Sequence, residues 1–366
     1  MPVSPDHQHA NGEIDIASLH AQDSTGLLAR IDRAVVWDIP LTTPFRGITR
    51  RDGVLLHGPG GWGEVAPFWD YGLEASAPWL ASGLCQALGN SLLPRYRETI
   101  SVNVTVPEVG AQDASDLVRA SGARTAKVKV SGSSDKRSAD LERLEAVRSA
   151  LGRSGKVRID VNGAWDLDTA RENLPLMDRA AGGLEYAEQP CATVYDLADL
   201  RRAVDVPIAA DESIRLSANP LEIVHRRAAD VAILKVAPLG GVHRALDMAE
   251  RLGLPAVVSS ALDTSVGIMA GATLAFSLPS LNHACGLGTT YLLTQDVAEP
   301  SVRPSNGTLR LDAAAPVSER LLNEVKAGPY LTKHWQTRLL HLAGALHARR
   351  QREARDPSRA VAGLPL

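Results

Sequence analysis

Three acidic residues at regular intervals place the strongest constraint on what this chain can fold into. Asp160, Glu188 and Asp211 each end a short apolar run, and roughly 25 residues separate each one from the next. That interval is about the length of one strand, one crossover helix and two short loops, so it predicts carboxylates at the C-terminal ends of three consecutive parallel strands. Carboxylates that converge in this way repel one another. The usual compensation is a bound hard cation, and Mg²⁺ is the commonest oxygen-ligated choice in enzymes.

The same interval appears in a wider repeat. Short apolar or β-branched runs lie at Ala126–Val130, Val157–Val161, Leu184–Glu188, Pro207–Asp211, Val231–Lys235 and Ala256–Ser260. Helix-like stretches lie between them, at Asp140–Leu151, Thr169–Ala181, Tyr195–Ala203, Pro220–Ala228 and Val242–Leu252. This repeated strand–helix unit predicts an α/β fold, a modified (β/α) TIM-type barrel, more readily than an open sheet. In such barrels the chemistry takes place at the C-terminal ends of the strands.

The chain outside the repeat divides into further regions. Residues 27–107 mix strand signals with a turn-rich segment and lack the repeat, so we expect an α+β capping domain there, completed by residues 303–345. The barrel domain is expected over residues 108–302. Residues 1–26 are expected to be a disordered leader, and residues 346–366 a flexible tail.

Composition limits the classes of function. The 366 residues, 45% hydrophobic and 22% charged, can bury a large core in more than one domain. A net charge of −3 gives no sign of the basic surface that binds nucleic acid. The three cysteines are far apart and form no C-x-x-C pair, so neither disulfides nor a zinc site is expected. No apolar run approaches the roughly 20 residues of a membrane span, and no signal peptide is evident, so we expect a cytoplasmic protein whose oligomeric state is open.

Three lysines accompany the acids. Lys127 and Lys129 are two residues apart on an expected strand, so both side chains point to one face, toward the barrel interior. Two ammonium groups that close repel each other, so we expect a depressed pKa for at least one of them. The resulting neutral amine is the form that a general base requires. Lys235 ends a later strand, and the curvature of the barrel would bring it round to face Lys129.

A cation between two lysines suits the abstraction of a proton next to a carboxylate. That reaction produces an enediolate dianion, which is unstable unless cations hold its two oxygens. A metal coordinated to the substrate carboxylate does this as a Lewis acid. One lysine on each face of the flat intermediate can serve as base, acid or fixed cation. The residues therefore predict an enzyme that acts on a small-molecule carboxylate.

Five motifs follow one another along the chain. They are Lys127-Val-Lys129, Asp160-Val-Asn162, Glu188-Gln-Pro190, Asp211-Glu-Ser213 and Lys235-Val-Ala-Pro-Leu-Gly-Gly241. The set resembles the K-x-K, D-x-N, E-x-P, D-E-S and K-x-x-x-x-G-G motifs of the enolase superfamily, muconate-lactonizing subgroup, in which a lysine or histidine base works with Mg²⁺. The resemblance spans about residues 27–325. Within the subgroup, the segments Pro44–Gly47, Gly61–Phe68 and Ser259–Gly267 are most similar to o-succinylbenzoate synthases of the actinobacterial type.

The resemblance implies roles for the motif residues. The Mg²⁺ ligands would be Asp160, Glu188 and Asp211, with Mn²⁺ as a substitute cation. Lys129 would remove the α-proton and return it to the leaving hydroxyl. Lys235 would stabilise the enediolate from the opposite face, and Lys127 would tune Lys129. The implied reaction is the syn dehydration of 2-succinyl-6-hydroxy-2,4-cyclohexadiene-1-carboxylate to 2-succinylbenzoate, a carbon–oxygen lyase step in menaquinone biosynthesis.

A second set of residues is expected to bind the rest of the substrate. It comprises Arg46, Asn162, Glu212, Ser259, Ser260, Thr264 and Ser265. Each has a plainer interpretation: Arg46 as surface charge, Asn162 as a turn cap, Glu212 as an ion-pair residue, and the four hydroxyl residues as loop caps. A single acid at a strand end is likewise more often a helix N-cap or a salt-bridge partner.

Two alternatives stay open. The same site could serve an N-succinylamino acid racemase, a dipeptide epimerase or a muconate cycloisomerase. Racemisation needs proton transfer by both Lys129 and Lys235, whereas dehydration needs chemistry from Lys129 only. A non-catalytic metal-binding or scaffold protein on a barrel is the other alternative, and Mg²⁺-dependent turnover would exclude it.

Overall fold

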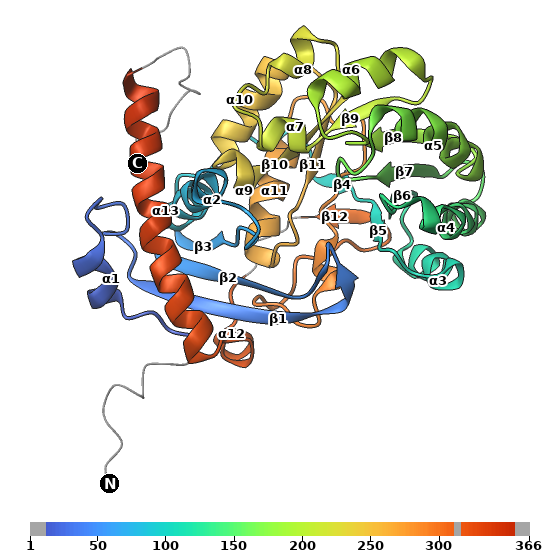
Figure 1. The fold of residues 1–366 in the computed structure, drawn as a ribbon. Coiled ribbons are helices and arrows are strands. Elements are labelled where there is room, and N and C mark those ends of the chain that lie inside the picture. Colours follow the sequence, from blue (N-terminus) through green and yellow to red (C-terminus); the bar gives the residue numbers. More distant parts are fainter. Residues whose placement is uncertain (1–11, 311–315, 356–366) are drawn as a thin grey trace.

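A curled parallel sheet lies at the centre of the structure, a computed structural model that describes residues 12–310 and 316–355 (Figure 1). Its seven strands follow the order β11-β10-β9-β8-β7-β6-β5. Their bounds are Val104–Val106 (β5), Thr125–Lys129 (β6), Lys156–Asp160 (β7), Leu184–Glu188 (β8), Ile208–Ala210 (β9), Val231–Lys235 (β10) and Ala256–Ser259 (β11). Each strand is parallel to its neighbours, so all seven C-terminal ends meet at one edge.

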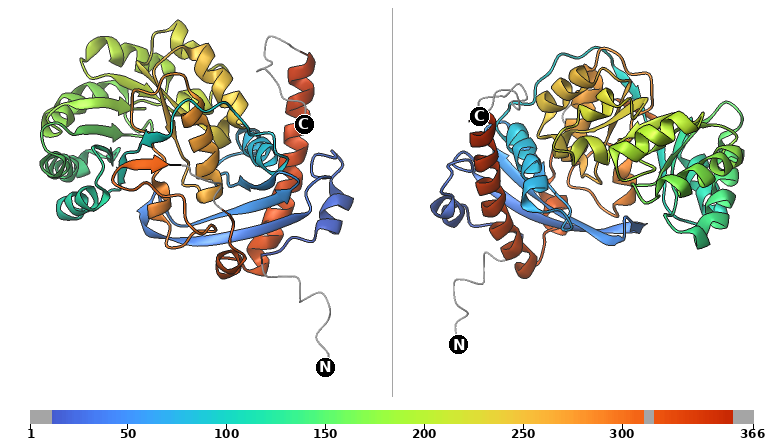
Figure 2. Two further views of the ribbon diagram at one scale, coloured as in Figure 1. Left: turned by 180° about the vertical axis from the view of Figure 1, so that it is seen from behind. Right: turned by 45° about the horizontal axis from the view of Figure 1, so that its top comes forward.

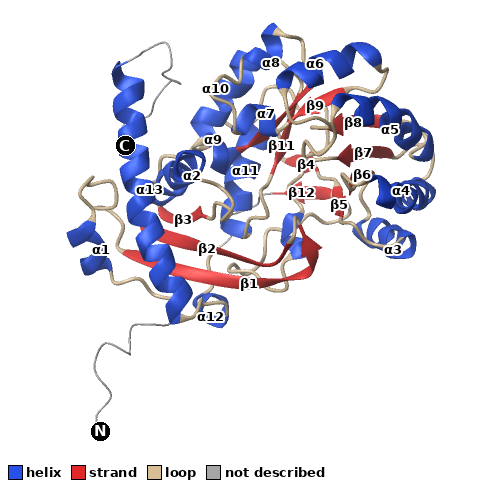
Figure 3. Ribbon diagram, in the orientation of Figure 1, coloured by secondary structure: helices blue, strands red, loops and turns tan. Residues whose placement is uncertain are grey.

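Helices lie along the outer side of this sheet (Figure 3). They are α3 (Ala111–Ser121), α4 (Arg137–Leu151), α5 (Leu167–Ala180), α6 (Val194–Ala203), α8 (Glu222–His225), α10 (Val242–Leu252) and α11 (Ser265–Ser277). The short helices α7 (Glu212–Arg215) and α9 (Val236–Leu239) instead follow the C-terminal ends of β9 and β10. Local sequence sets their ends. Asp166 caps α5 by accepting a hydrogen bond from the backbone N of Thr169 at 2.8 Å. Gly253 ends α10 at φ 61°, a left-handed conformation that favours glycine.

The segment around Cys285 closes the sheet into a barrel. The carbonyl of Cys285 accepts a hydrogen bond from the N of Asn103 at 2.9 Å, beside β5. On the other edge, the N of Gly286 donates to the carbonyl of Val258 at 2.8 Å, and the carbonyl of Gly286 accepts from the N of Ser260 at 3.0 Å. Both edges are thereby joined through a short irregular segment. The predicted fold class, a modified (β/α) barrel with a cap, is confirmed.

A second, antiparallel sheet carries the capping part of the molecule (Figure 2). It consists of β1 (Arg33–Phe45), β2 (Ile48–Gly58) and β3 (Gly61–Val65). Helices α2 (Leu73–Ala87) and α13 (Pro329–Arg355) pack against it and bury Trp79 and Trp335. The remaining elements are α1 (Ile16–Gln22), α12 (Glu319–Glu324), and the strand pair β4 (Thr99–Ser101) and β12 (Thr308–Arg310).

The expected disorder at the chain ends is wrong for the residues that the structure describes there. In place of a disordered leader over 1–26, residues 16–22 form α1, which Asp15 caps and which buries Leu19. In place of a flexible tail over 346–366, α13 continues to Arg355, and Glu353 pairs with Arg244 at 2.7 Å. Both segments have tertiary partners that local composition does not reveal. Residues 1–11 and 356–366 lie outside the described residues.

The predicted border between the capping and barrel parts needs a correction. The expected capping region, 27–107, includes Val104–Val106, yet these residues form β5 and pair with β6 of the barrel sheet. A strand of three residues is too short to show an alternating pattern in the sequence. The division into two domains otherwise stays a prediction.

Among residues 12–310 and 316–355, none of the helices combines the length and apolar character that a bilayer span requires.

A charged cluster at the N-terminal end of the barrel leads to a prediction of acid sensitivity. Glu185 contacts Arg158 at 2.5 Å, Lys156 at 2.7 Å and His283 at 3.0 Å. Burial raises the pKa of Glu185, but these three partners outweigh burial and hold the pKa well below its ordinary value. A carboxylate of this kind stabilises the fold above its unfolded-state pKa, and that stabilisation is lost as the pH falls through its folded-state pKa.

We therefore expect Glu185→Gln to lower the free energy of unfolding at pH 7 by about 2 kcal/mol, the scale of hydrogen bonds to a charged group. Urea unfolding at pH 7 and at about pH 4 measures the change, and the difference from the wild type should shrink at the lower pH. An equal difference at both pH values would show that the carboxylate charge is not the source.

Candidate active site

The predicted catalytic residues come together at the C-terminal ends of neighbouring strands. Lys129 at the end of β6 lies opposite Asp160 at the end of β7, and Asp160 lies opposite Glu188 at the end of β8. Asp211 follows β9 directly, and Lys235 ends β10. The parallel register therefore places these side chains along one edge of the sheet, as the spacing of the acids predicts.

Each lysine is bonded to the acids. Lys127 Nζ lies 2.8 Å from Asp160 Oδ2 and 2.6 Å from Glu188 Oε1. Lys129 Nζ lies 2.7 Å from the same Asp160 oxygen. Lys235 Nζ lies 2.6 Å from Asp211 Oδ2. The three carboxylates are at most 2% exposed, so these pairs are screened little by solvent.

The two lysines of β6 differ in their proton affinity. Burial lowers the pKa of Lys127, but Asp160 and Glu188 outweigh burial and hold that pKa well above its ordinary value. Burial also lowers the pKa of Lys129; Asp160 opposes this, and the positive charge of Lys127 adds to it, so the pKa of Lys129 ends below its ordinary value. This direction for Lys129 agrees with the expectation from the sequence, and its role as the base stays a prediction.

The acids form an oxygen-rich set that fits a hard cation. Burial, reinforced by the charge of Asp160, raises the pKa of Glu188 to about 7. Glu188 Oε2 is buried and has no hydrogen-bond partner among the described residues, which is costly unless something binds there. The acids are paired with cationic side chains, Asp160 and Glu188 with Lys127 and Asp211 with Lys235. Within residues 12–310 and 316–355, no group of three or more His, Cys, Asp or Glu side chains is arranged so that it could hold a metal ion. Their assignment as metal ligands stays a prediction.

A cavity of about 60 Å³ opens above these residues. Lys127, Lys129, Asp160 and Lys235 line its floor, and residues of the capping part line it as well. The capping side contributes the aromatic rings of Phe45, Phe68 and Trp79. Charged side chains on the floor and aromatic rings on the wall suit a substrate that presents a carboxylate to the floor and a flat hydrocarbon ring to the wall.

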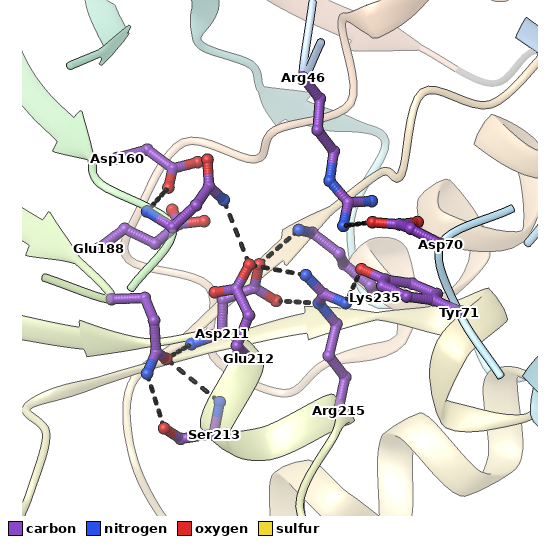
Figure 4. Close-up of polar contacts among 12 residues, drawn as sticks. Arg46, Asp70, Tyr71, Asp160, Glu188, Asp211, Glu212, Ser213, Arg215 and Lys235 are labelled. Atoms are coloured by element: carbon purple, nitrogen blue, oxygen red, sulfur yellow. Dashed lines mark hydrogen bonds and ion pairs between the residues drawn. The ribbon is translucent and has the colours of Figure 1, made fainter. Parts of the chain in front are cut away.

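Four of the expected substrate-binding residues line this cavity: Arg46, Asn162, Ser259 and Ser260. Arg46 stands in the β1–β2 turn at φ 52°, bonded to Asp70 at 3.2 Å (Figure 4). Asn162 accepts a hydrogen bond from Lys129 Nζ through its side-chain oxygen. The Asn162 amide nitrogen donates to Glu212 Oε1 at 3.2 Å, so Glu212 lies one contact behind the cavity wall.

Thr264 and Ser265 do not line the cavity, which corrects the expectation for them. Thr264 caps α11, and its hydroxyl donates to Glu64. The Ser265 hydroxyl donates to Asp296 Oδ2 at 2.5 Å and accepts from the N of Val302 at 2.7 Å. Both side chains are fully buried. The start of α11 turns them away from the strand ends, so the plainer interpretation of loop capping holds for these two.

Sequence reasoning missed Arg215. Its Nε lies 2.9 Å from Asp211 Oδ1, its Nη2 lies 2.7 Å from Glu212 Oε1, and its Nη1 donates to the hydroxyl of Tyr71 at 2.6 Å (Figure 4). Burial lowers the pKa of Arg215, but Asp211 and Glu212 outweigh burial and raise it above its ordinary value. The spacing of four residues from Asp211 on a short helix is the signal that could have revealed the ion pair.

Family models cover most of the described chain. Residues 110–316 match the model described as enolase C-terminal domain-like. Residues 36–87 match the model described as enolase N-terminal domain-like. The first match covers the barrel from α3 onward together with its closing segment, and the second covers most of β1 together with β2, β3 and α2.

Curated relatives and solved structures give finer likenesses. An o-succinylbenzoate synthase of Thermobifida fusca (strain YX) is 52% identical over 305 residues, which cover 82% of this chain and 93% of that protein. An o-succinylbenzoate synthase of Mycobacterium ulcerans (strain Agy99) is 47% identical over 310 residues, covering 84% and 93%. The muconate lactonizing enzyme from Pseudomonas putida has a similar fold, with a TM-score of 0.67 and 20% identity over 81% of this chain and 99% of that one.

Proposed function

The chain belongs to the enolase superfamily, and from this premise we propose that it is a lyase with o-succinylbenzoate synthase activity. It dehydrates 2-succinyl-6-hydroxy-2,4-cyclohexadiene-1-carboxylate to 2-succinylbenzoate, a step of menaquinone biosynthesis. The substrate assignment rests on the 52% identity to an o-succinylbenzoate synthase, over an alignment that covers 93% of that protein. Racemase, epimerase and cycloisomerase activities are not favoured, since the matched structures with such names are only 20–25% identical to this chain. We also retain a cytoplasmic location as a proposal.

Activity in this family depends on a divalent metal ion. We propose Mg²⁺, with Mn²⁺ as a substitute, held by Asp160, Glu188 and Asp211. Their buried oxygens support this assignment, in particular Glu188 Oε2, for which the part of the chain that the structure describes offers no hydrogen-bond partner. When bound, the cation would supply Lewis-acid stabilisation of negative charge on the substrate carboxylate.

The three lysines have different roles. Lys129, whose pKa is lowered, is the base that takes the proton next to the substrate carboxylate, and it then returns that proton to the departing hydroxyl to form water. One group that serves both steps from one face gives a syn elimination. Lys127, whose pKa is raised, stays cationic, and its charge helps to lower the pKa of Lys129. Lys235, on β10, stabilises the enediolate from the opposite face, and aromatisation of the ring helps to drive the reaction.

The cavity wall holds the remaining parts of the substrate. We propose that the aromatic rings of Phe45 and Phe68 cover the substrate ring and that Arg46 attracts a carboxylate. The hydroxyls of Ser259 and Ser260 lie on the same wall and can donate to the succinyl group. Asn162 and Glu212 orient the base through the hydrogen bond between Asn162 and Lys129.

The Lys235→Arg variant distinguishes dehydratase activity from racemase activity. Arginine keeps the positive charge but cannot exchange a proton near neutral pH, so we expect dehydration to survive with kcat lowered about 10- to 100-fold and any racemisation to vanish. Steady-state kinetics with both classes of substrate measure this, and Lys156→Arg, on an exposed lysine at the other end of the barrel, is the control. Solvent-deuterium exchange from both faces of a bound substrate in the wild type would contradict the assigned role of Lys235.

The substrate itself is tested with a panel. The purified protein is assayed with the cyclohexadiene carboxylate and, in parallel, with several N-succinylamino acids. We expect turnover of the first, at a kcat/KM typical of enzymes, about 10⁴ M⁻¹ s⁻¹ or more. Turnover of an N-succinylamino acid with none of the cyclohexadiene carboxylate would overturn the proposed substrate.

A further inference from the structure

The loop between β11 and α11 forms one wall of the cavity and is held in a strained shape. Ser260, Ala261 and Leu262 line the cavity. Leu262 has φ 65°, a left-handed conformation that is unfavourable for a residue with a branched side chain. Such a conformation persists only where neighbouring groups hold it. The groups that hold this loop come from the capping part of the molecule.

Arg51, on β2, is the first of these groups. Its side chain is buried, and its Nε donates to the carbonyl of Leu262 at 3.2 Å. Its Nη2 donates to the carbonyl of Ala66 and lies 3.5 Å from the carbonyl of Ala261. The guanidinium carbon also lies 4.2 Å from the centre of the Phe68 ring, which lines the cavity. One arginine therefore joins the strained loop to the aromatic wall.

The charge of Arg51 is costly in this place. Among residues 12–310 and 316–355, Arg51 makes no ion pair, and its direct partners are backbone carbonyls. A buried charge without a paired acid destabilises a fold unless its hydrogen bonds repay the cost. Asp263, Asp52 and Glu64 are the nearby acids that act on it electrostatically. We therefore interpret the hydrogen bonds of Arg51 as fixing the conformation of the loop rather than as raising the overall stability of the fold.

Glu64, on β3, is the second group. Its Oε1 accepts a hydrogen bond from the N of Thr264 at 3.2 Å, and its Oε2 accepts from the N of Gly267 at 3.0 Å and from the Thr264 hydroxyl. The Glu64 carboxyl group thus binds backbone N–H groups at the N-terminus of α11, directly after the strained loop. A Cβ at position 267 would lie 3.2 Å from the Glu64 carboxyl carbon and 2.7 Å from the Asp263 Cβ, so this approach needs a glycine.

We propose that Arg51 and Glu64 are positioning residues that hold the loop 260–264 in the shape required for substrate binding, so that the capping part sets substrate affinity through buried contacts. The inference rests on the proposed function for the identity of the substrate. Neither residue lines the cavity or contacts the catalytic lysines. Their loss should therefore weaken binding more than it slows the chemistry.

Arg51→Lys tests the first contact, with Arg148→Lys as a matched control. Lysine keeps the charge but cannot span the carbonyls of Leu262 and Ala66. Arg148 also donates to backbone carbonyls, those of Gly152 and Gly155 among them, but at the far end of the barrel. We expect Arg51→Lys to raise KM about tenfold with kcat within about threefold, and amide exchange in residues 261–267 to become faster. Arg148→Lys should change neither.

Glu64→Gln and Thr264→Val test the second contact without removing volume. Glutamine has one acceptor oxygen, whereas the two oxygens of Glu64 accept hydrogen bonds from Thr264 and Gly267. Valine at position 264 lacks the hydroxyl. Thr264→Ser keeps the hydroxyl and should have the KM and amide exchange of the wild type. Both disruptive variants should reproduce the higher KM and the faster exchange. A lower melting temperature with unchanged KM, with or without faster exchange, would overturn the proposal. If the wild type does not turn over the cyclohexadiene carboxylate, the proposed function fails, while unchanged exchange in both variants would reject the positioning role independently.

Discussion

Replacing Lys129 with methionine is expected to lower kcat for dehydration by about 10⁴-fold, the upper end of what general acid–base catalysis contributes. Lys129 takes the proton and returns it, so its loss affects both halves of the reaction. Methionine fills a similar volume without an amine. Steady-state kinetics with the cyclohexadiene carboxylate measure the effect, and a melting curve checks the fold.

Lys136→Met is the control for that variant. Lys136 is exposed in the segment that follows β6, and its contact with Glu108 is 3.4 Å. This variant should retain wild-type kinetics. If Lys129→Met kept more than about one hundredth of the wild-type kcat, Lys129 would not be the base, because one such group supplies at least about 10²-fold.

Replacing Glu188 with glutamine is expected to lower kcat/KM by about 10²- to 10³-fold, the scale of losing one charge-stabilising group. The change removes a negative charge and one acceptor from the acid whose Oε2 has no partner among the described residues. The affinity for Mg²⁺ or Mn²⁺ should fall as well, and calorimetric titration with either ion measures it.

Glu185→Gln is the matched control on the same strand. Glu185 lies at the opposite end of β8 and pairs with Arg158 and Lys156. We expect this variant to lose stability but to keep metal affinity and kcat/KM. Equal loss of metal affinity in the two variants, or none in Glu188→Gln, would contradict the assignment of Glu188 as a ligand.

The barrel and the floor of the site could be predicted because both follow from local periodicity. Each acid or lysine at a strand end is fixed by a short apolar run before it, and parallel strands bring such ends together whatever the loops do. The spacing of Asp160, Glu188 and Asp211 therefore carried three-dimensional information. A depressed pKa for one of the two lysines could be expected from two positive charges on one face of a strand, whereas the raised pKa of Lys127 depends on its contacts with Asp160 and Glu188.

The features that could not be predicted depend on distant contacts. The barrel closes through Cys285 and Gly286, an irregular segment with no strand pattern. The hydrogen bond between Arg215 and Tyr71 joins residues 144 positions apart. Thr264 resembled a substrate donor because the sequence does not show that Glu64 binds it. In each case the deciding partner comes from another part of the chain.

Metal-assisted dehydration at this site is tested most directly by the rate of dehydration after EDTA has removed bound metal and Mg²⁺ is then titrated back. The three buried acids and the lysines beside them are predicted to give no turnover of the cyclohexadiene carboxylate above background after chelation. Added Mg²⁺ should restore turnover along a saturation curve, with 2-succinylbenzoate as the product. Turnover that is unaffected by EDTA, or no turnover at saturating Mg²⁺, would contradict a metal-assisted dehydration at this site.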